Sequence, residues 1–148
     1  MTKNRKVTLI EIFSTKRNFL LKVFLILYII SFIGASYNHS MDLIKYGLFP
    51  YQRINQNVSL ALNIYWTLLT VFDPLAIVLL YINIDLGLML LGLIIISDVV
   101  INYSYIISNS GWLGWLNFGQ LCQLGFLIFY LCTFLYIHKQ TQMLGSNT

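Results

Sequence analysis

Two aspartates lie inside stretches of the sequence that otherwise predict membrane-spanning helices. Asp73 stands in the segment Thr-Val-Phe-Asp-Pro, and Asp98 stands in Ile-Ile-Ser-Asp-Val. A carboxylate at the centre of a bilayer costs about 2.5 kcal/mol or more on insertion scales, so it requires a partner, a proton or a water-filled site. These two residues are therefore the first candidates for chemistry.

Helical periodicity places further polar residues on the same faces as the aspartates. At about 100° per residue, Asp73 lies at the flank of a stripe that includes Ser59 and Pro74. Three helices are each expected to turn one polar side toward protein rather than lipid. The candidate ligand-binding residues on these sides are Asn63, Thr67, Thr70 and Asp73, then Asp98, Asn102 and Tyr105, and finally Gln120 and Gln123.

The two aspartates are also expected at similar depth. Each lies about ten to twelve residues from the inner end of its helix, and every residue adds 1.5 Å along the axis. Most of the other polar candidates lie closer to the outer end. The sequence therefore predicts a polar cavity that opens outward, with two carboxylates at its floor.

Two carboxylates that share a desolvated site do not both ionise easily. A retained proton would suit a proton relay, a cation site or a general acid. The structural alternative is that Asp73 satisfies backbone groups freed by Pro74, whose ring and missing N–H disturb a helix. Asp98 could in the same way bond to Asn102 one turn on, or to Asn63 across the helix interface.

The elements that position these residues are predicted to be four membrane-spanning helices. Hydrophobic residues make up 58% of the 148 positions and charged residues only 9%, against about 25% charged in soluble domains. Apolar stretches of roughly 20 residues, which suffice for a core of about 30 Å, recur four times. The expected spans are residues 19–37, 58–82, 86–107 and 115–137, forming one all-α integral membrane domain over residues 1–148.

The distribution of basic residues predicts the orientation of this four-helix bundle. Seven of the nine lysines and arginines precede or begin the first span or follow the last, and only Lys45 and Arg53 fall in the connection after the first span. By the positive-inside rule both termini face the cytoplasm. The first span is interpreted as a retained anchor, because its apolar core exceeds the roughly 7 to 15 residues of a signal peptide.

Two flanking segments complete the predicted architecture. Leu9, Ile12 and Phe13 recur at helical spacing among charged residues, as in a short helix on an anionic inner leaflet. The connection from Asn38 to Asn57 mixes apolar, aromatic and charged residues. It is expected to lie across the outer mouth of the bundle as a lid or a simple strap.

The sequence gives no support for a cofactor, a metal site or a nucleic-acid partner. Cys122 and Cys132 are ten positions apart on one predicted helix, about 15 Å, too far for a mutual disulfide. Neither has metal-ligand spacing with His39 or His138. The net charge of +4 is explained by topology, since no exposed aromatic residues accompany the basic ones.

The second and third predicted spans resemble part of a known group of membrane proteins. The run from Tyr65 to Ala76, followed by Gly87 and by the run from Ser97 to Asn102, resembles the pattern of small uncharacterised bacterial four-span membrane proteins. That resemblance implies the bacterial inner membrane and no assigned reaction. A looser similarity to four-span sterol isomerase and sigma-2-receptor-like proteins, which keep acidic residues in a lipid-binding cavity, carries over no residue because the spacing differs.

Three classes of function fit these observations. The first is a binding or transport module whose aspartates hold a small ligand, proton or cation, acting as a homo-oligomer if it transports. The second is an accessory or immunity-type protein whose polar helix faces pack against a membrane partner. The third is an enzyme acting on a lipid-like substrate, which ranks last because no nucleophile or metal cluster supports it.

Overall fold

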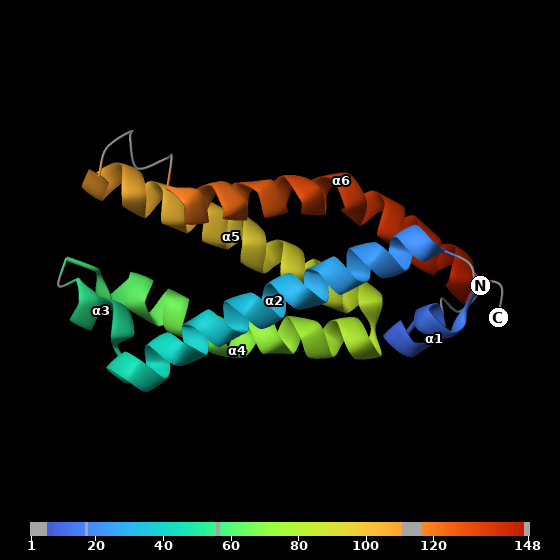
Figure 1. The fold of residues 1–148 in the computed structure, drawn as a ribbon, viewed down its shortest axis with the longest axis horizontal. Coiled ribbons are helices and arrows are strands. Elements are labelled where there is room, and N and C mark those ends of the chain that lie inside the picture. Colours follow the sequence, from blue (N-terminus) through green and yellow to red (C-terminus); the bar gives the residue numbers. More distant parts are fainter. Residues whose placement is uncertain (1–5, 17, 56, 111–116, 147–148) are drawn as a thin grey trace.

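The computed structural model describes residues 6–16, 18–55, 57–110 and 117–146. Its regular structure within these ranges is helical throughout (Figure 1). The elements are α1 (Leu9–Ser14), α2 (Phe19–Tyr46), α3 (Pro50–Ile54), α4 (Leu60–Ile82), α5 (Ile84–Ser110) and α6 (Phe118–Ser146).

Four of these helices are long and apolar enough to cross a membrane, namely α2, α4, α5 and α6. Their outward faces carry large apolar side chains that no part of the described chain covers, among them Ile30, Ile33, Val71, Val78, Leu93, Val100, Leu131 and Leu135. Contiguous apolar surface of this extent is the surface that contacts lipid. The expectation of an all-helical, multi-pass membrane protein is confirmed.

The first span is longer than the sequence predicted. Helix α2 continues nine residues beyond Tyr37, so much of the expected outer loop from Asn38 to Asn57 is regular helix. The prediction stopped where the apolar stretch ended, but that segment contains neither proline nor glycine to break the hydrogen-bonded ladder. The helix ends at Gly47, whose φ of 79° favours glycine.

The other spans also differ at their ends. Helix α4 begins after Ser59, whose hydroxyl accepts a hydrogen bond from the backbone N–H of Leu62 (3.3 Å), and α5 extends to Ile84 and Ser110. Helix α6 runs nine residues past Ile137, while the predicted start at 115 lies outside the described residues. Hydropathy detects the lipid-facing part of a helix, whereas backbone hydrogen bonding continues past it.

Helices α4 and α5 form a hairpin with a single non-helical residue, Asn83, at the turn. A side chain at Gly87 would collide with the backbone nitrogen and Cα of Leu80, so the two helices approach backbone to backbone there. Asn83 Oδ1 accepts a hydrogen bond from the backbone N–H of Leu86 (3.3 Å) and so caps the start of α5.

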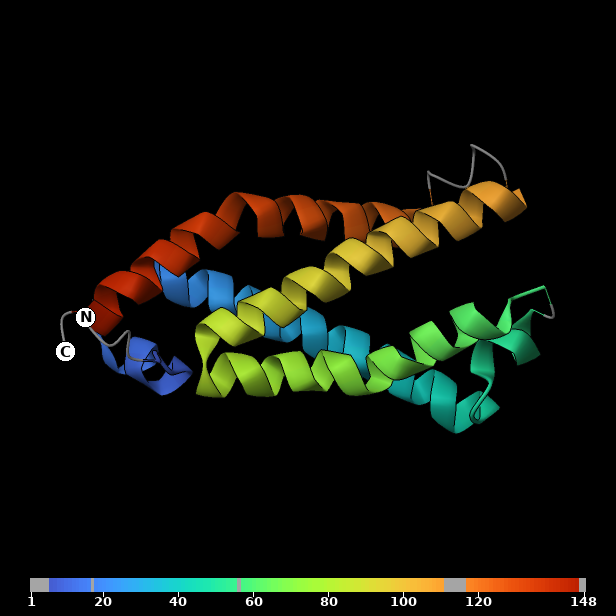
Figure 2. The same cartoon turned by 180° about the vertical axis from the view of Figure 1, so that it is seen from behind.

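Helices α4 and α5 are the two inner elements of the bundle. Helix α5 packs against α4 on one side and α6 on the other, while α2 packs mainly against α4. Figures 1 and 2 show that α5 and α6 diverge from α2, α3 and α4 at the end opposite the two termini. Fully buried apolar side chains, among them Leu21, Leu80 and Leu88, lie near the terminal end of these helices.

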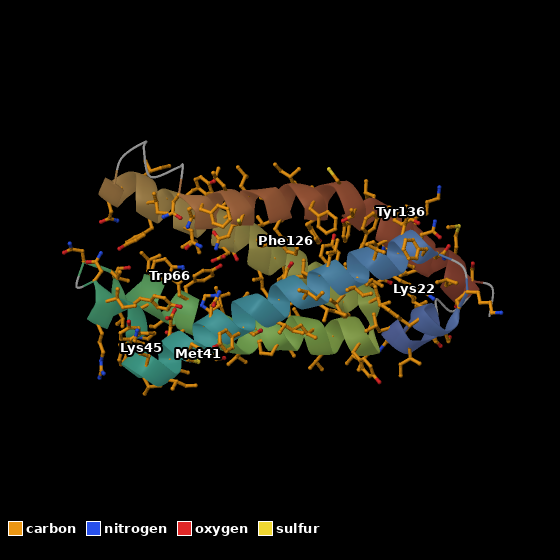
Figure 3. All side chains as sticks on the ribbon, in the orientation of Figure 1. Lys22, Met41, Lys45, Trp66, Phe126 and Tyr136 are labelled. Carbon is orange, nitrogen blue, oxygen red and sulfur yellow. The ribbon has the colours of Figure 1, made fainter. Side chains whose placement is uncertain are left out.

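An aromatic cluster between α2 and α6 fills the terminal half. The ring of Phe24 contacts the ring of Phe129 edge to face (5.6 Å between centroids), and Tyr28 contacts Phe126 in the same way (5.7 Å). Figure 3 labels two members of this cluster, Phe126 and Tyr136. The Tyr28 and Thr133 hydroxyls share a hydrogen bond. The Tyr130 hydroxyl donates to the carbonyl of Leu88 (3.1 Å). These contacts join three helices into a packed base.

The short helix expected near the N-terminus is α1. Thr8 and Glu11 form a capping box at its start, and Lys22 donates from Nζ to the carbonyl of Thr15 beyond its end (2.6 Å). Ile12 is buried, and the backbone N–H of Ile84 donates to the carbonyl of Val7 (3.2 Å). The segment therefore packs on the bundle beside the turn between α4 and α5.

Candidate functional site

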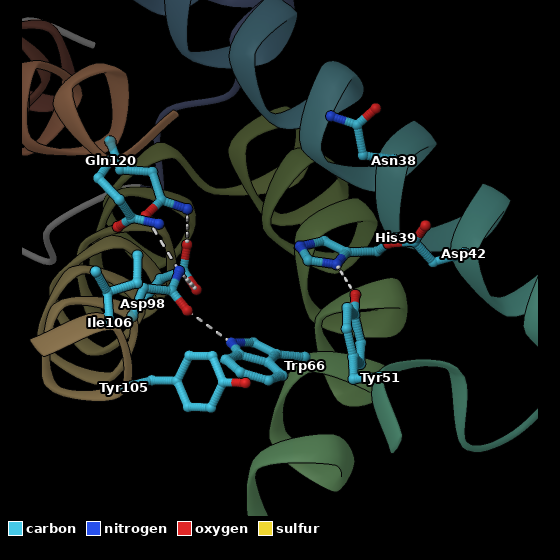
Figure 4. Close-up of a pocket in the computed structure, with 11 residues that line it drawn as sticks. Asn38, His39, Asp42, Tyr51, Trp66, Asp98, Tyr105, Ile106 and Gln120 are labelled. Carbon is cyan, nitrogen blue, oxygen red and sulfur yellow. Dashed lines mark hydrogen bonds between the residues drawn. The ribbon is translucent and has the colours of Figure 1, made fainter. Parts of the chain in front are cut away.

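A cavity of about 300 Å³ lies where the helices diverge. All the elements from α2 to α6 contribute to its lining, so it is a feature of the assembled bundle (Figure 4). The lining residues are Asn38, His39, Asp42, Tyr51, Trp66, Asp98, Asn102, Tyr105, Ile106, Gln120 and Gln123.

Asp98 occupies one wall of this cavity within a cluster of amides. Its Oδ1 accepts a hydrogen bond from Asn102 Nδ2 (2.9 Å), and its Oδ2 accepts one from Gln123 Nε2 (2.8 Å). Asn102 Nδ2 also donates to Gln123 Oε1 (3.1 Å). Neutral amides stabilise a carboxylate without cancelling its charge, and each carboxylate oxygen keeps a second lone pair. Asp98 is 9% exposed.

Trp66 connects this cluster to an aromatic wall. Its indole Nε1 donates to Asn102 Oδ1 (2.8 Å), and its ring lies between those of Tyr51 (5.0 Å between centroids) and Tyr105 (5.3 Å). Asn55 Nδ2 donates to the Tyr105 hydroxyl (2.9 Å), which ties the end of α3 to α5. Three rings from three helices are thereby held at the cavity.

Asp73 belongs to a second polar cluster. It is 1% exposed, and its Oδ2 lies 3.9 Å from Nε2 of His39 without any hydrogen-bond partner. His39 Nδ1 and the Tyr51 hydroxyl are joined by a hydrogen bond of 2.8 Å. Burial, followed by the nearby Asp42 carboxylate, raises the pKa of the Tyr51 hydroxyl, which keeps it protonated. His39 therefore stands between Asp73 and the cavity.

The nine residues expected at the site fall into two groups. Five line the cavity, namely Asp98, Asn102, Tyr105, Gln120 and Gln123. Asn63, Thr67, Thr70 and Asp73 lie on α4 but are not among the lining residues. Asp98 lines the cavity and Asp73 does not, but the two carboxylates lie close enough to interact electrostatically.

Asn63 has a structural contact that the sequence did not suggest. Its Oδ1 accepts hydrogen bonds from the backbone N–H groups of Tyr51 (3.0 Å) and Gln52 (3.2 Å), and so holds the first turn of α3. Its Nδ2 is buried without a partner. The suggested contact between Asn63 and Asp98 is not formed, whereas the one between Asn102 and Asp98 is.

The two threonine hydroxyls of α4 differ in their hydrogen bonding. Thr67 donates from its hydroxyl to the carbonyl of Asn63 (2.7 Å), one turn earlier, which satisfies it within its own helix. The Thr70 hydroxyl is buried and has no partner. The buried face of α4 does not coincide with the polar stripe predicted from the sequence. It passes through Trp66 and Asp73, whereas Ser59 and Pro74 of the predicted stripe are exposed.

His39 and Asp42 were missed because they were assigned to a loop. On a continuous helix they are three positions apart and share one face, which turns toward Tyr51 and Asp73. The absence of a helix breaker before Gly47 was the feature that could have revealed them. Trp66 was placed at the flank of a stripe but not among the site residues.

Two other polar regions lie outside this cavity. A cavity of about 390 Å³ near the start of α4 and the end of α5 is lined mainly by small, hydroxyl-bearing and apolar side chains, including Ser59, Ser104 and Ser108. At the opposite end, Asp85 contacts His138 Nδ1 (3.0 Å) and the hydroxyl of Thr141 (3.2 Å).

The described ranges contain no group of three or more histidine, cysteine, aspartate or glutamate side chains that could hold a metal ion. Cys122 and Cys132 are free and exposed on α6. The polar contacts gather instead around two buried carboxylates.

Comparison of the chain with protein-family models, with curated proteins and with solved structures gave no match.

Proposed function

We propose that this chain is an inner-membrane protein that holds a small ligand, proton or cation in the cavity between its four spans. The observation that carries the proposal is Asp98, an acidic side chain that lines a cavity of about 300 Å³ while bonded only to neutral amides. An intramembrane carboxylate without a cationic partner is costly, so its retention favours a functional role.

Asp73 and His39 add a second acidic group behind the cavity wall. Asp73 Oδ2 has no hydrogen-bond partner, and the nearest cationic candidate is His39 at 3.9 Å. This distance exceeds a hydrogen bond. In the proposed function His39 and Asp73 share a proton, and a charge bound beside Asp98 alters how tightly that proton is held.

The orientation belongs to the same proposal. Both termini face the cytoplasm, so the cavity opens toward the outer side. Support comes from the excess of basic residues near the termini and from the position of α1, whose Ile10 and Phe13 remain exposed at the terminal end of the bundle. These two apolar side chains insert into the inner leaflet in this arrangement.

Thiol accessibility tests whether the cavity is wet and electrostatically negative. Ile106→Cys, introduced into a variant without Cys122 and Cys132, reacts with a small cationic thiosulfonate added from outside about tenfold faster than with an anionic one. Adding Asp98→Asn reduces that ratio, while adding Asp85→Asn does not. Leu93→Cys is the lipid-facing control, because Leu93 is 66% exposed on the apolar face of α5.

One outcome of the thiol experiment would contradict a water-filled cavity. Equal, slow reaction of Ile106→Cys and Leu93→Cys with both reagents would mean that the cavity is dry, and the proposal would be abandoned.

One observation favours the alternative of a partner-binding protein. The second cavity is lined by Ser104 and Ser108, small residues one helical turn apart that allow close helix approach. A membrane partner or a second copy of the chain packs there in this alternative. Crosslinking from Ser104→Cys in native membranes tests it, and recovery of the uncrosslinked chain alone would count against it.

A further inference from the structure

The cavity combines two features that select different parts of one ligand. Its walls carry the rings of Tyr51, Trp66 and Tyr105, and the carboxylates of Asp98 and Asp42 lie on opposite sides of it (Figure 4). No lysine or arginine is found among the residues that line it. Aromatic faces and carboxylates both attract positive charge, so an organic cation satisfies both features.

The geometry of the rings supports this selection. Trp66 meets Tyr51 at 60° and Tyr105 at 85°, so the three rings do not stack into one flat layer. Rings inclined in this way form a corner that can surround a cationic head. The indole N–H is fixed by Asn102, which prevents the Trp66 ring from turning freely.

An unpaired side-chain oxygen of Gln120 indicates which kind of cation fits the cavity. Gln120 lines the cavity, and its Oε1 is buried without any hydrogen-bond donor. A buried acceptor left unpaired costs about 1–3 kcal/mol. A ligand that brings an N–H group removes this cost, whereas a quaternary ammonium brings no donor of its own. An inorganic cation would coordinate Oε1 directly, but it has no hydrocarbon part to pack against the aromatic rings.

We propose that the ligand of this cavity is a protonated organic amine whose ammonium group donates to Asp98 and Gln120 and packs against Trp66. This inference rests on the proposed function and specifies the chemical class of its ligand. The hydrocarbon part of the amine lies against the Tyr51 and Tyr105 rings. Asp42 contributes negative charge at the rim, next to the Tyr51 hydroxyl.

The test compares four probes on the full chain in lipid nanodiscs by titration calorimetry, with empty nanodiscs as the blank for partitioning. The probes are phenethylammonium, its trimethylated quaternary analogue, neutral phenethyl alcohol and sodium chloride. Phenethylammonium is expected to bind saturably and about tenfold or more tightly than the alcohol, because only the cation gains the charged contacts. The quaternary analogue is expected to bind with intermediate affinity.

Matched variants assign the effect to the cavity. Asp98→Asn is expected to weaken phenethylammonium binding about tenfold or more, and Asp85→Asn, which removes a carboxylate at the opposite end of the bundle, leaves it unchanged. Gln120→Met preserves the length of the side chain but removes the free acceptor. It should reduce the preference for the primary over the quaternary ammonium, because only the Asp98 carboxylate then remains to accept from the N–H groups, and this readout stands even if Asp98→Asn fails to fold.

The contradicting results separate the two proposals. Equal affinity for the alcohol and the ammonium, or displacement of the ammonium by sodium, would overturn the amine assignment and leave a ligand cavity in place. Absence of saturable binding by every probe would also overturn it, while the reactivity of Ile106→Cys decides independently whether the cavity admits water and cations.

Discussion

Asp98 shows how the oxygens of an acidic residue can be hydrogen-bonded inside a bundle. Two amide groups donate to its oxygens, and both amides come from neutral side chains on α5 and α6. The hydrogen bonds offset part of the desolvation cost, and each carboxylate oxygen keeps a lone pair for a ligand. The buried Asp73, by contrast, has one oxygen without a partner and a histidine just beyond hydrogen-bond distance.

Thr70 provides the sharpest test of the candidate residues on α4. Its hydroxyl is buried and makes no hydrogen bond, so Thr70→Val keeps the shape of the side chain and removes an unsatisfied group. We expect unchanged ligand binding and a stability that is equal or higher by up to about 1 kcal/mol. Thermal unfolding in detergent and the phenethylammonium titration measure the two effects.

Thr67→Val is the matched control for this substitution. The Thr67 hydroxyl is already bonded within its own helix, so its removal should change little in either measurement. A loss of ligand binding in Thr70→Val alone would show that Thr70 contacts the ligand, and that α4 contributes more to the site than Trp66.

The elements determine where the cavity lies. Helices α4 and α5 meet closely at Gly87, and the aromatic cluster between α2 and α6 fills the terminal half of the bundle. Helix α3 is held by Asn63 and Asn55 so that Tyr51 covers one side of the open half. Aromatic side chains therefore pack the end of the bundle near the termini. Polar contacts of α3 hold Tyr51 beside the cavity at the opposite end.

Gly87→Ala tests the close approach of α4 and α5. The new methyl group would overlap the backbone of Leu80, and backbone cannot move aside as a flexible side chain can. We expect a loss of about 1–3 kcal/mol in the free energy of unfolding. Reversible unfolding of the protein in lipid or detergent measures the loss.

Gly34→Ala is the control, because a Cβ at Gly34 meets no atom within 4 Å. Its stability should be equal to that of the unmodified protein or slightly higher, since alanine has the higher helix propensity. If Gly87→Ala were as stable as Gly34→Ala, the backbone contact would not be part of the folded protein.

The sequence predicted the number, order and helical nature of the spans because long apolar stretches leave few alternatives in a bilayer. Of the two structural contacts that the sequence offered for Asp98, the one with Asn102 is formed, since residues four apart on a helix are neighbours. The contacts of Asp98 with Gln123 and of Trp66 with Asn102 depend on how separate helices are rotated, which no local pattern encodes. His39 escaped detection because the length of α2 was underestimated.

At the scale of the whole molecule, the arrangement gives the two ends of the bundle different roles. The termini, α1 and the turn between α4 and α5 lie together at one end, and α3 and the open cavity lie at the other. In a membrane these two ends face opposite compartments, so the orientation of the bundle decides from which compartment a ligand reaches the cavity.

The orientation of the bundle across the membrane can be measured with single cysteines placed in the variant without Cys122 and Cys132. Lys45→Cys, near the end of α2 beside α3, is expected to react with a membrane-impermeant maleimide on intact cells, and Lys6→Cys only after the membrane is opened. The reverse pattern would place the cavity on the cytoplasmic side and overturn the proposed direction of ligand entry.

The most direct measurement of ligand binding in the cavity is an experimental map of the protein in a lipid nanodisc with phenethylammonium, at a resolution that shows side chains. We predict that α5 and α6 are separated from α2 and α4 at the end that carries α3, with non-protein density in contact with Asp98, Trp66 and Gln120. Helices that close against each other there, with protein side chains filling the space around Asp98, would contradict the proposed site.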